Sequence, residues 1–363
     1  MPRIDSFLKL GLAQGCSDGH LAVGGPPMLR MHGDLMPIKF RDLSDTELDS
    51  YVDEILSDSQ REHFATGHDL DFSYVGEEGA RFRVNLFRKA TGVGAVFRHI
   101  PNKVPTLEDL ALPPVIRDFC DFHQGMVLVT GSTGTGKSTT LAAMINHLNQ
   151  TRHLNIISLE DPIEFVHPSK NCQVIQRELG THLTSFADGV RSAMREDPDV
   201  ILVGELRDAD TISMAMTAAE TGHLVLGTLH TTGAIKTIDR VVDALPGELR
   251  EQTKSFLAQS LKAVVTQVLV KTVDGRSRKA ILEILVNNRA ISKLIMTDQT
   301  HQIPAQLQTG RDVGMQLMDQ ALLEAIEKRE VDPDDAFRYA NDKRMFKRFV
   351  TDTGILPVLD ETA

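Results

Sequence analysis

A glycine-rich segment in the middle of the chain constrains the fold more than any other part of the sequence. It follows the apolar run 126–130 and precedes the helix-forming run 139–144. Its residues are Gly131-Ser132-Thr133-Gly134-Thr135-Gly136-Lys137-Ser138-Thr139. A P-loop has this context: a strand leads into the glycine loop, and a helix follows the loop. The segment therefore predicts binding of a nucleoside triphosphate, and the alternative is a glycine turn that holds no ligand.

The chemistry of this loop explains the prediction. Its glycines let several backbone N–H groups point at a phosphate chain, and the helix N-terminus adds partial positive charge. Lys137 can reach the β- and γ-phosphates, and the Ser138 hydroxyl can coordinate Mg²⁺. We therefore expect residues 131–139 to bind the nucleotide and Ser138 to be a magnesium ligand.

The composition limits the classes of partner. The chain has 363 residues, is 41% hydrophobic and carries a formal net charge of −11, which argues against an extended nucleic-acid surface. No apolar run approaches the roughly 20 residues of a membrane helix. Cys16, Cys120 and Cys172 form no Cys-x-x-Cys pair, so neither a zinc site nor a disulfide framework is indicated. We expect a cytoplasmic protein that neither spans a membrane nor binds nucleic acid.

The pattern along the chain predicts two domains joined by a linker. Residues 1–99 are typical of a small α+β domain, with an opening helix, a second helix capped by Ser44 with Glu47 in a capping box, and strands after residue 70. The prolines in 100–112 indicate a linker, because proline favours extended backbone. The second domain is then 113–363.

Strands and helices alternate in the second domain. We expect strands at 126–130, 155–159, 200–203 and 224–229. We expect helices at 137–149, 184–196, 208–221 and 233–244. This order predicts an α/β fold with a parallel, doubly wound sheet. The remaining part, roughly 248–350, is predicted to be a helical tail.

A second strong motif lies at the end of the strand 200–203. The strand 200–203 places Glu205 at the carboxyl edge of the sheet, where ligands of open α/β folds bind. A Walker-B strand does this next to the P-loop. Gly204 stands where many such enzymes keep a magnesium-binding aspartate, so we expect Glu205 to act on metal-bound or attacking water. The alternative is that Glu205 only pairs with Arg207.

Three carboxylates follow the strand 155–159, namely Glu160, Asp161 and Glu164. Like charges this close are unfavourable unless a cation shares them. Beside a P-loop, a bound Mg²⁺ with a water molecule that it polarises would be such a cation. The alternative is a solvated acidic turn.

Two histidines, His223 and His230, flank the strand 224–229. We expect them to contact phosphate or to relay strain between the nucleotide and a helix. A zinc pair and inert loop residues are the alternatives. Since the two histidines lie at opposite ends of one strand, a zinc pair is disfavoured.

Three arginines of the first domain, Arg81, Arg83 and Arg98, are also candidates. Surface arginines are usually solvated. In a nucleotide-driven machine, however, guanidinium groups from another domain or subunit can neutralise charge on the transferred γ-phosphoryl group.

At this point the motifs resemble a known family. The chain is similar to the PilT-type retraction ATPases of bacterial type IV pili, within the secretion-ATPase superfamily, from about residue 4 to about 340. Besides the P-loop, the resemblance rests on these blocks: 17–20 (SDGH), 81–85 (RFRVN), 94–98 (GAVFR), 160–164 (EDPIE), 176–178 (QRE), 195–199 (REDPD), 204–208 (GELRD), 219–223 (AETGH) and 227–231 (GTLHT).

The resemblance implies a homohexameric ring of subunits, each with a PAS-like N-terminal domain and a RecA-like ATPase domain. It implies hydrolysis of ATP to ADP and phosphate, coupled to pilus retraction through a PilC-like platform protein at the cytoplasmic face of the inner membrane. It also implies roles for the residues already singled out: Glu160, Asp161 and Glu164 in an Asp box, Glu205 in an atypical Walker B motif, His223 and His230 in a His box, and Arg81, Arg83 and Arg98 near the nucleotide.

Several features bear on the position within the superfamily. Extension and type II secretion ATPases usually carry a Cys₄ zinc insert, which this sequence lacks, so retraction is favoured. The family's Ala-Ile-Arg-Asn-Leu-Ile-Arg helix is replaced by Ala290-Ile291-Ser292-Lys293-Leu294-Ile295-Met296, and Gly19 stands where an apolar residue is usual. These departures suggest an accessory PilU-like paralogue or second PilT. An active motor, an accessory ring on a sister ATPase and a related secretion ATPase therefore all stay open.

Overall fold

The structure, a computed structural model, describes residues 2–31, 34–76, 79–100 and 103–355. It divides into two compact units, which we call the first unit (1–103 with 162–166) and the second unit (104–161 with 167–363). Residues 101–102 of the predicted linker lie outside the described residues, as do 356–363 at the end of the predicted second domain. None of the described helices is long and apolar enough to cross a membrane.

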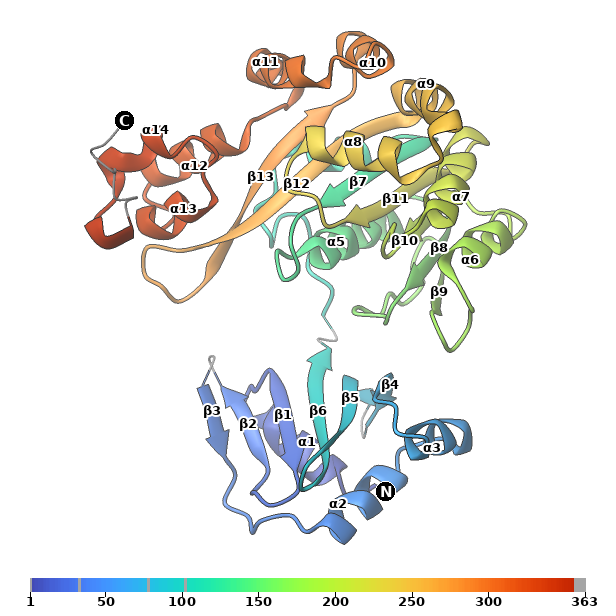
Figure 1. Cartoon of the computed structure of the whole chain (residues 1–363), viewed down its shortest axis with the longest axis vertical. Coiled ribbons are helices and arrows are strands. Elements are labelled where there is room, and N and C mark those ends of the chain that lie inside the picture. Colours follow the sequence, from blue (N-terminus) through green and yellow to red (C-terminus); the bar gives the residue numbers. More distant parts are fainter. Residues whose placement is uncertain (1, 32–33, 77–78, 101–102, 356–363) are drawn as a thin grey trace. The chain divides into compact units, whose positions relative to one another are not determined.

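The first unit is a six-stranded antiparallel sheet, in the order β3-β2-β1-β6-β5-β4, packed against three helices (Figure 1). Side chains alternate along β5, where Phe82, Val84 and Leu86 join the core with the helices. The strands are β1 Asp18–Ala22, β2 Met28–Met31, β3 Asp34–Pro37, β4 Leu70–Val75, β5 Arg81–Lys89 and β6 Gly92–Ile100. The helices are α1 Asp5–Ala13, α2 Asp45–Asp53 and α3 Asp58–Ala65.

The capping box predicted at the second helix is half formed, and α2 begins after Ser44 as expected. The Glu47 carboxylate accepts from the Ser44 backbone N–H, but within the described residues the Ser44 side chain makes no capping hydrogen bond. The Glu47 carboxylate also accepts hydrogen bonds from Arg41 at 2.6 and 2.7 Å and from the Tyr51 hydroxyl at 2.7 Å. The complete capping box of this unit is at the next helix, between Ser57 and Gln60.

The second unit contains a seven-stranded sheet in the order β13-β12-β7-β11-β10-β8-β9. Its strands are parallel except β13, which pairs antiparallel with β12. The strands are β7 Gly125–Thr130, β8 Asn155–Glu160, β9 Gln173–Glu178, β10 Val200–Val203, β11 Leu224–Leu229, β12 Leu261–Lys271 and β13 Arg278–Val286. The predicted parallel sheet is therefore confirmed.

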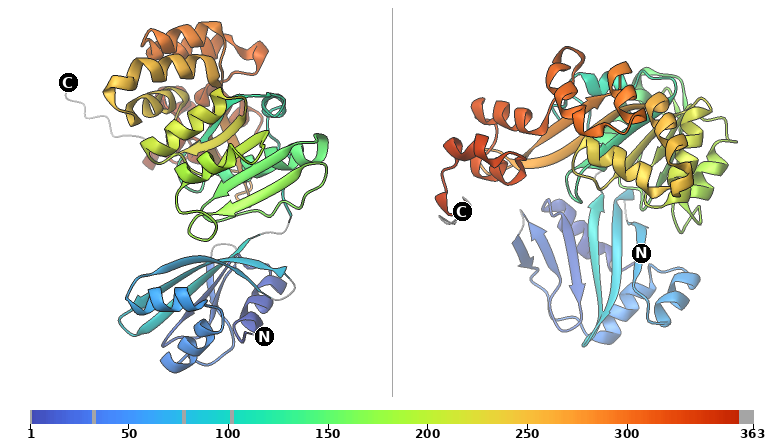
Figure 2. Two further views of the ribbon diagram at one scale, coloured as in Figure 1. Left: turned by 90° about the vertical axis from the view of Figure 1, so that its right-hand side faces the viewer. Right: turned by 45° about the horizontal axis from the view of Figure 1, so that its top comes forward.

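Helices cover both faces of this sheet (Figures 1 and 2). One face packs against α4 and α5, and the other packs against α6 to α11. The helices are α4 Val115–Phe119, α5 Lys137–Thr151, α6 Phe186–Ala193, α7 Ala209–Glu220, α8 Ala234–Ala244, α9 Arg250–Ser260, α10 Arg289–Met296, α11 Ile303–Thr309, α12 Met318–Glu327, α13 Pro333–Tyr339 and α14 Lys343–Phe346. Short 3₁₀ helices lie at η2 Gly247–Leu249, η3 Thr300–Gln302, η4 Arg311–Val313, η5 Lys347–Phe349 and η6 Thr353–Ile355.

The predicted helical tail is only partly correct. Its first half contains β12 and β13, which extend the sheet on the far side of the P-loop strand. β12 pairs with β7 in parallel, and Thr266 lies level with Thr130, the last residue before the P-loop. Helix α9 precedes these strands and further helices follow β13, where α12, α13 and α14 form a separate apolar cluster with the outer ends of β12 and β13. The tail therefore contributes directly to the strand edge at which the nucleotide motif lies.

Candidate functional site

The P-loop has the predicted context of strand, loop and helix. β7 ends at Thr130, and α5 begins at Lys137 after Gly136, whose φ of 85° is left-handed. The Lys137 ammonium is buried and donates to the carbonyls of Gly131 at 2.8 Å and Ser132 at 3.1 Å. The lysine is thus held inside the loop, at the position where a phosphate chain would meet it.

A glutamine from β12 braces the same loop, and the sequence interpretation missed it. Gln267 is 2% exposed; its Nε2 donates to the Thr135 carbonyl at 2.6 Å, and its Oε1 accepts from the Thr140 hydroxyl at 2.7 Å. A Cβ added at Gly131 would lie 2.4 Å from the Gln267 carbonyl oxygen. Only glycine therefore fits at that position, where φ is 139°. A polar residue in the apolar run 263–270 was the available signal.

Glu205 follows β10 and lies in a small network of charged side chains. One of its carboxylate oxygens accepts from Arg207 Nε at 2.7 Å, and the other lies 3.2 Å from His230 Nε2. Arg207 also donates to Asp161 at 3.1 Å. The hydrogen bond that Arg207 donates to Glu205, aided by the charges of Glu205 and Asp161, raises the pKa of Arg207 above its ordinary value despite partial burial. The ion pair of the alternative interpretation is therefore present, together with a histidine contact.

The strand order sets the spacing between the strand of Glu205 and the P-loop strand. β11 lies between the P-loop strand β7 and β10, so the acid strand is not the immediate neighbour of the P-loop strand. Two strand spacings of about 4.8 Å separate β10 from β7. A Cβ at Gly204 would lie 3.0 Å from the Leu159 carbonyl oxygen and 3.3 Å from Glu160 Cα, which explains why an aspartate is absent there.

The carboxylates at the end of β8 have different partners. Glu160 accepts from Ser158 at 2.7 Å and from Gln176 at 3.0 Å, whereas Asp161 pairs with Arg207. Glu164 is exposed and belongs to the first unit. In the part of the chain that the structure describes, no three His, Cys, Asp or Glu side chains are placed to hold a metal ion. That these carboxylates share a cation with the bound nucleotide stays a prediction.

The two histidines lie at opposite edges of the sheet. β11 runs parallel to β7, so His230 follows its carboxyl end and lies on the P-loop side, whereas His223 precedes Leu224, which is level with Gly125. His223 Nδ1 lies 2.9 Å from the Ala218 carbonyl oxygen near the end of α7. The expectation that both histidines contact phosphate at one edge is thus corrected: His230 joins the Glu205 network, and His223 does not.

Comparison with known proteins decides the family. Residues 73–350 match the family described as type II/IV secretion system protein. The chain is similar to the type IV pilus retraction ATPase PilT of Pseudomonas aeruginosa, with 49% identity over 319 residues, covering 88% of this chain and 92% of that protein. A twitching motility protein of Neisseria gonorrhoeae is 50% identical over 314 residues, covering 86% of this chain and 84% of that protein.

A solved structure agrees with the sequence relatives. The crystal structure of the pilus retraction motor PilT with bound ADP has a TM-score of 0.89 and 38% identity, covering 95% of this chain and 99% of that chain. This chain belongs to the PilT-type pilus retraction ATPases. Membership confirms the predicted fold class, the ATPase activity and the function in pilus retraction.

In this PilT-type chain, the candidate arginines lie on the sheet of the first unit. Arg83 and Arg98 are directly opposite each other on β5 and β6, and Arg98 is opposite Asp18 on β1. Arg98 Nε donates to Asp18 at 2.9 Å and its side chain is 68% exposed. Burial raises the pKa of Asp18, but hydrogen bonds from Ser17 and Arg98 outweigh it and hold that pKa below its ordinary value. Arg81 begins β5 and is half-buried.

The altered family helix is α10. Ile291 and Ile295 are buried and Leu294 packs beside them, so these three residues at helical spacing serve packing. Ser292, where the family has arginine, donates to the Ala258 carbonyl of α9 at 2.6 Å, and Met296 is 52% exposed. A Cβ at Gly19 would meet Leu8 Cδ2 at 3.6 Å and Phe97 Cβ at 3.9 Å, which are ordinary contacts. Nothing in the structure explains that glycine.

Proposed function

We propose that this chain forms a homohexameric ring that couples ATP hydrolysis to pilus retraction through a PilC-like platform protein at the cytoplasmic face of the inner membrane. The observation that carries the proposal is the shared sheet edge. The P-loop, Glu205 and His230 all follow the carboxyl ends of parallel strands in one unit. Open α/β sheets bind their ligands at that edge.

Residues 131–139 supply the nucleotide site in this proposal. The backbone N–H groups of the loop and of the first turn of α5 bind the phosphates of ATP, and Lys137 exchanges its carbonyl partners for the β- and γ-phosphates. The oxygen donors of Ser138 and Glu205 are the hard ligands that Mg²⁺ prefers. Bound Mg²⁺ would neutralise charge on the β- and γ-phosphates.

Glu205 acts on the attacking water. Its carboxylate is held from two sides, by Arg207 at 2.7 Å and by His230 at 3.2 Å, so its oxygens are already fixed in direction. A fixed carboxylate can accept a hydrogen bond from a water molecule and take its proton as the water attacks. Asp161 restrains Arg207, and so acts as a positioning residue.

The roles of the other candidates stay predictions. Glu160 and Glu164 are proposed to orient the acidic segment after β8, and His223 to fix the start of β11 against α7. Arg81, Arg83 and Arg98 are proposed to bring positive charge to the γ-phosphoryl group of a bound ATP. The Arg98 side chain is paired with Asp18 but 68% exposed, which supports that role because exposed ion pairs are weak and can be exchanged for a phosphate.

A second function is favoured by one observation. The departure of α10 from the family sequence supports a ring that assembles with a sister retraction ATPase and contributes little hydrolysis itself. Ser292 is bound to Ala258, and two family arginines are replaced. In that case the ATPase site would be dispensable for the cellular role.

Turnover by the purified enzyme tests the site. Glu205→Gln keeps the shape of the side chain but cannot accept a proton, so we expect ATP turnover to fall about 100-fold or more. ADP affinity should stay unchanged, because the P-loop is intact. The matched control is Glu220→Gln, which removes an exposed carboxylate at the end of α7. Turnover of the Glu205 variant at the control's rate would contradict the proposed role.

Complementation separates the two cellular functions. The gene is deleted in its host, and wild type or Glu205→Gln is returned while pilus retraction and surface piliation are scored. Rescue by the wild type alone is expected for a motor. Equal rescue by both would overturn the motor and favour the accessory ring.

A further inference from the structure

A buried carboxylate, Glu283, interrupts the otherwise apolar run 280–286 of β13. It is 8% exposed, and its strand neighbours Ile281 and Leu285 are also buried. A carboxylate in such surroundings is unfavourable unless hydrogen bonds satisfy it. The mechanism described above assigns nothing to this group.

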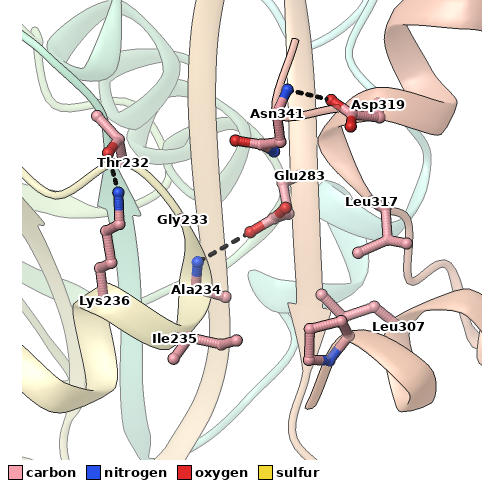
Figure 3. A pocket seen from close by; sticks show the side chains of 11 residues that line it. Thr232, Gly233, Ala234, Ile235, Lys236, Glu283, Leu307, Leu317, Asp319 and Asn341 are labelled. Atoms are coloured by element: carbon pink, nitrogen blue, oxygen red, sulfur yellow. Dashed lines mark hydrogen bonds between the residues drawn. The ribbon is translucent and has the colours of Figure 1, made fainter. Parts of the chain in front are cut away.

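Both oxygens of Glu283 accept a hydrogen bond from the first residue of a helix, and Figure 3 shows the one from Ala234. Oε1 accepts from the Ala234 backbone N–H of α8 at 2.9 Å, and Oε2 accepts from the Met318 backbone N–H of α12 at 3.3 Å. Helix N-termini carry partial positive charge and unpaired N–H groups, which makes them suitable partners for a carboxylate. One side chain thus joins the starts of two helices.

The first of these helices, α8, directly follows the loop that contains His230. Only Thr231, Thr232 and Gly233 separate His230 from Ala234, and His230 contacts Glu205 at 3.2 Å. The Thr237 hydroxyl of α8 lies 2.7 Å from the hydroxyl of Thr231, the residue after His230, so the loop is also joined to the side of α8. The bond from Glu283 to Ala234 therefore fixes the end of the segment that places His230.

The second helix belongs to the C-terminal helices. α12 packs with α13 and α14 in one apolar cluster, and the residues before it run along β13. The backbones of Gln316 and Ile284 exchange two hydrogen bonds at 2.9 and 3.1 Å. Across the sheet, Glu283 is level with Thr266, and Thr266 is level with Thr130 at the end of the P-loop strand. The carboxylate is therefore level with the last residue before the P-loop, two strands away from it, and in direct contact with the tail.

Apolar packing between α8 and the tail is incomplete at this point. A cavity of about 330 Å³ lies beside Glu283, and Ile235, Leu307 and Leu317 are among the residues that line it. Where side chains do not fill the space, van der Waals contacts between the two elements are lost, so a direct hydrogen bond becomes a larger part of what joins them. Glu283 supplies that bond across the cavity.

We propose that Glu283 is a positioning residue of the ATPase reaction, which couples the C-terminal helices α12 to α14 to the alignment of His230 with Glu205. The proposal rests on the roles proposed above for His230 and Glu205. Movement of α12, such as a partner bound to the C-terminal helices would cause, would pull the start of α8 and change the rate of hydrolysis without changing nucleotide affinity.

The first test is Glu283→Gln, measured as kcat, KM for ATP and ADP affinity. The amide has an NH₂ group in place of one carboxylate oxygen, so one of the two backbone N–H groups faces a donor instead of its acceptor. We expect kcat to fall about tenfold, since small misplacements of reacting groups are costly. KM and ADP affinity should stay at the wild-type values. The control Glu330→Gln removes another carboxylate between β13 and the tail, paired with Lys279 at 2.7 Å, and should leave kcat unchanged.

Combination with His230→Ala shows whether Glu283 acts through the histidine. If it does, adding Glu283→Gln to His230→Ala lowers kcat no further. Losses that multiply would overturn the proposal and leave Glu283 a structural residue. If His230→Ala alone keeps wild-type turnover, the proposed site itself fails. If His230→Ala loses turnover but Glu283→Gln does not, only the inference about Glu283 fails.

A second variant covers the case in which Glu283→Gln does not fold. Met318→Pro removes the N–H that binds Oε2, and proline is favoured at the first position of a helix. The preceding Leu317 has φ −83° and ψ 149°, which suits a residue before proline. Met318→Ala loses the same side chain but keeps the N–H. We expect kcat of the proline variant to be about fivefold below that of the alanine variant. Equal kcat values would overturn the proposal.

Discussion

One histidine of the second unit is held neutral by its surroundings. His167 lies between β8 and β9, is 9% exposed, and its backbone N–H donates to the Gln176 side chain at 2.8 Å. Burial, with a smaller contribution from the charge of Lys170, lowers its pKa from 6.5 to about 4. Protonation of this imidazole therefore opposes folding, because the unfolded chain binds the proton more readily than the folded chain does.

This difference predicts a stability that depends on pH. The contribution of His167 is complete above pH 6.5 and is lost as the pH falls toward 4. One pKa unit corresponds to 1.36 kcal/mol, so the free energy of unfolding should fall by about 2 kcal/mol between pH 8 and pH 5 from this group alone. Denaturant titrations of wild type and His167→Gln at pH 8 and pH 5 measure this change in the free energy of unfolding. The control His153→Gln, at an exposed position, should show the same change in the free energy of unfolding between the two pH values as the wild type. If His167→Gln also shows that change, the pH dependence does not come from His167.

At the scale of elements, the sequence predicted best where a strand, its loop and its helix are contiguous. β10 and β11 have the predicted bounds, and β7 with α5 differs only at the ends. β12 was missed because it is buried on both faces, and an apolar run without alternation does not distinguish a buried strand from a helix. Gln267 and Glu283 were missed with it, since their partners lie far away in the sequence. Glu205 was found from its strand, but its contact with His230 depends on the strand order.

The hydrogen bonds from Gln267 of β12 to the P-loop and α5 predict an effect on nucleotide affinity. Gln267→Ala leaves the Thr135 carbonyl and the Thr140 hydroxyl without their partner, which costs about 1–3 kcal/mol. We expect ADP affinity to fall about tenfold, because the loop is no longer held in its binding conformation. Titration calorimetry measures it. Asn287→Ala also removes an amide that donates to two backbone carbonyls, Ala258 and Leu261, and should keep the affinity; an equal loss in both variants would exclude a specific brace.

At the scale of the whole molecule, each unit has its own core. The apolar cluster of the first unit contains residues between 4 and 97, and the three clusters of the second unit contain only residues after 106. The division was visible in the sequence because a proline-containing segment separates two different patterns. The assignment of residues 162–166 to the first unit was not visible, since it depends on contacts between distant parts of the chain.

Separate cores predict two unfolding transitions in scanning calorimetry, and nucleotide should act on them unequally. ADP at 100 times its Kd stabilises the unit that binds it by about 2.7 kcal/mol, which for a domain of 150–250 residues raises Tm by about 5–10 °C. We expect that shift in the transition of the second unit, which holds the P-loop. A single transition that shifts as a whole would show that the two cores unfold together. A smaller shift of the first transition, abolished by Arg98→Ala, is expected if the arginines of β5 and β6 reach bound nucleotide; persistence of that shift in the variant would assign it to other contacts.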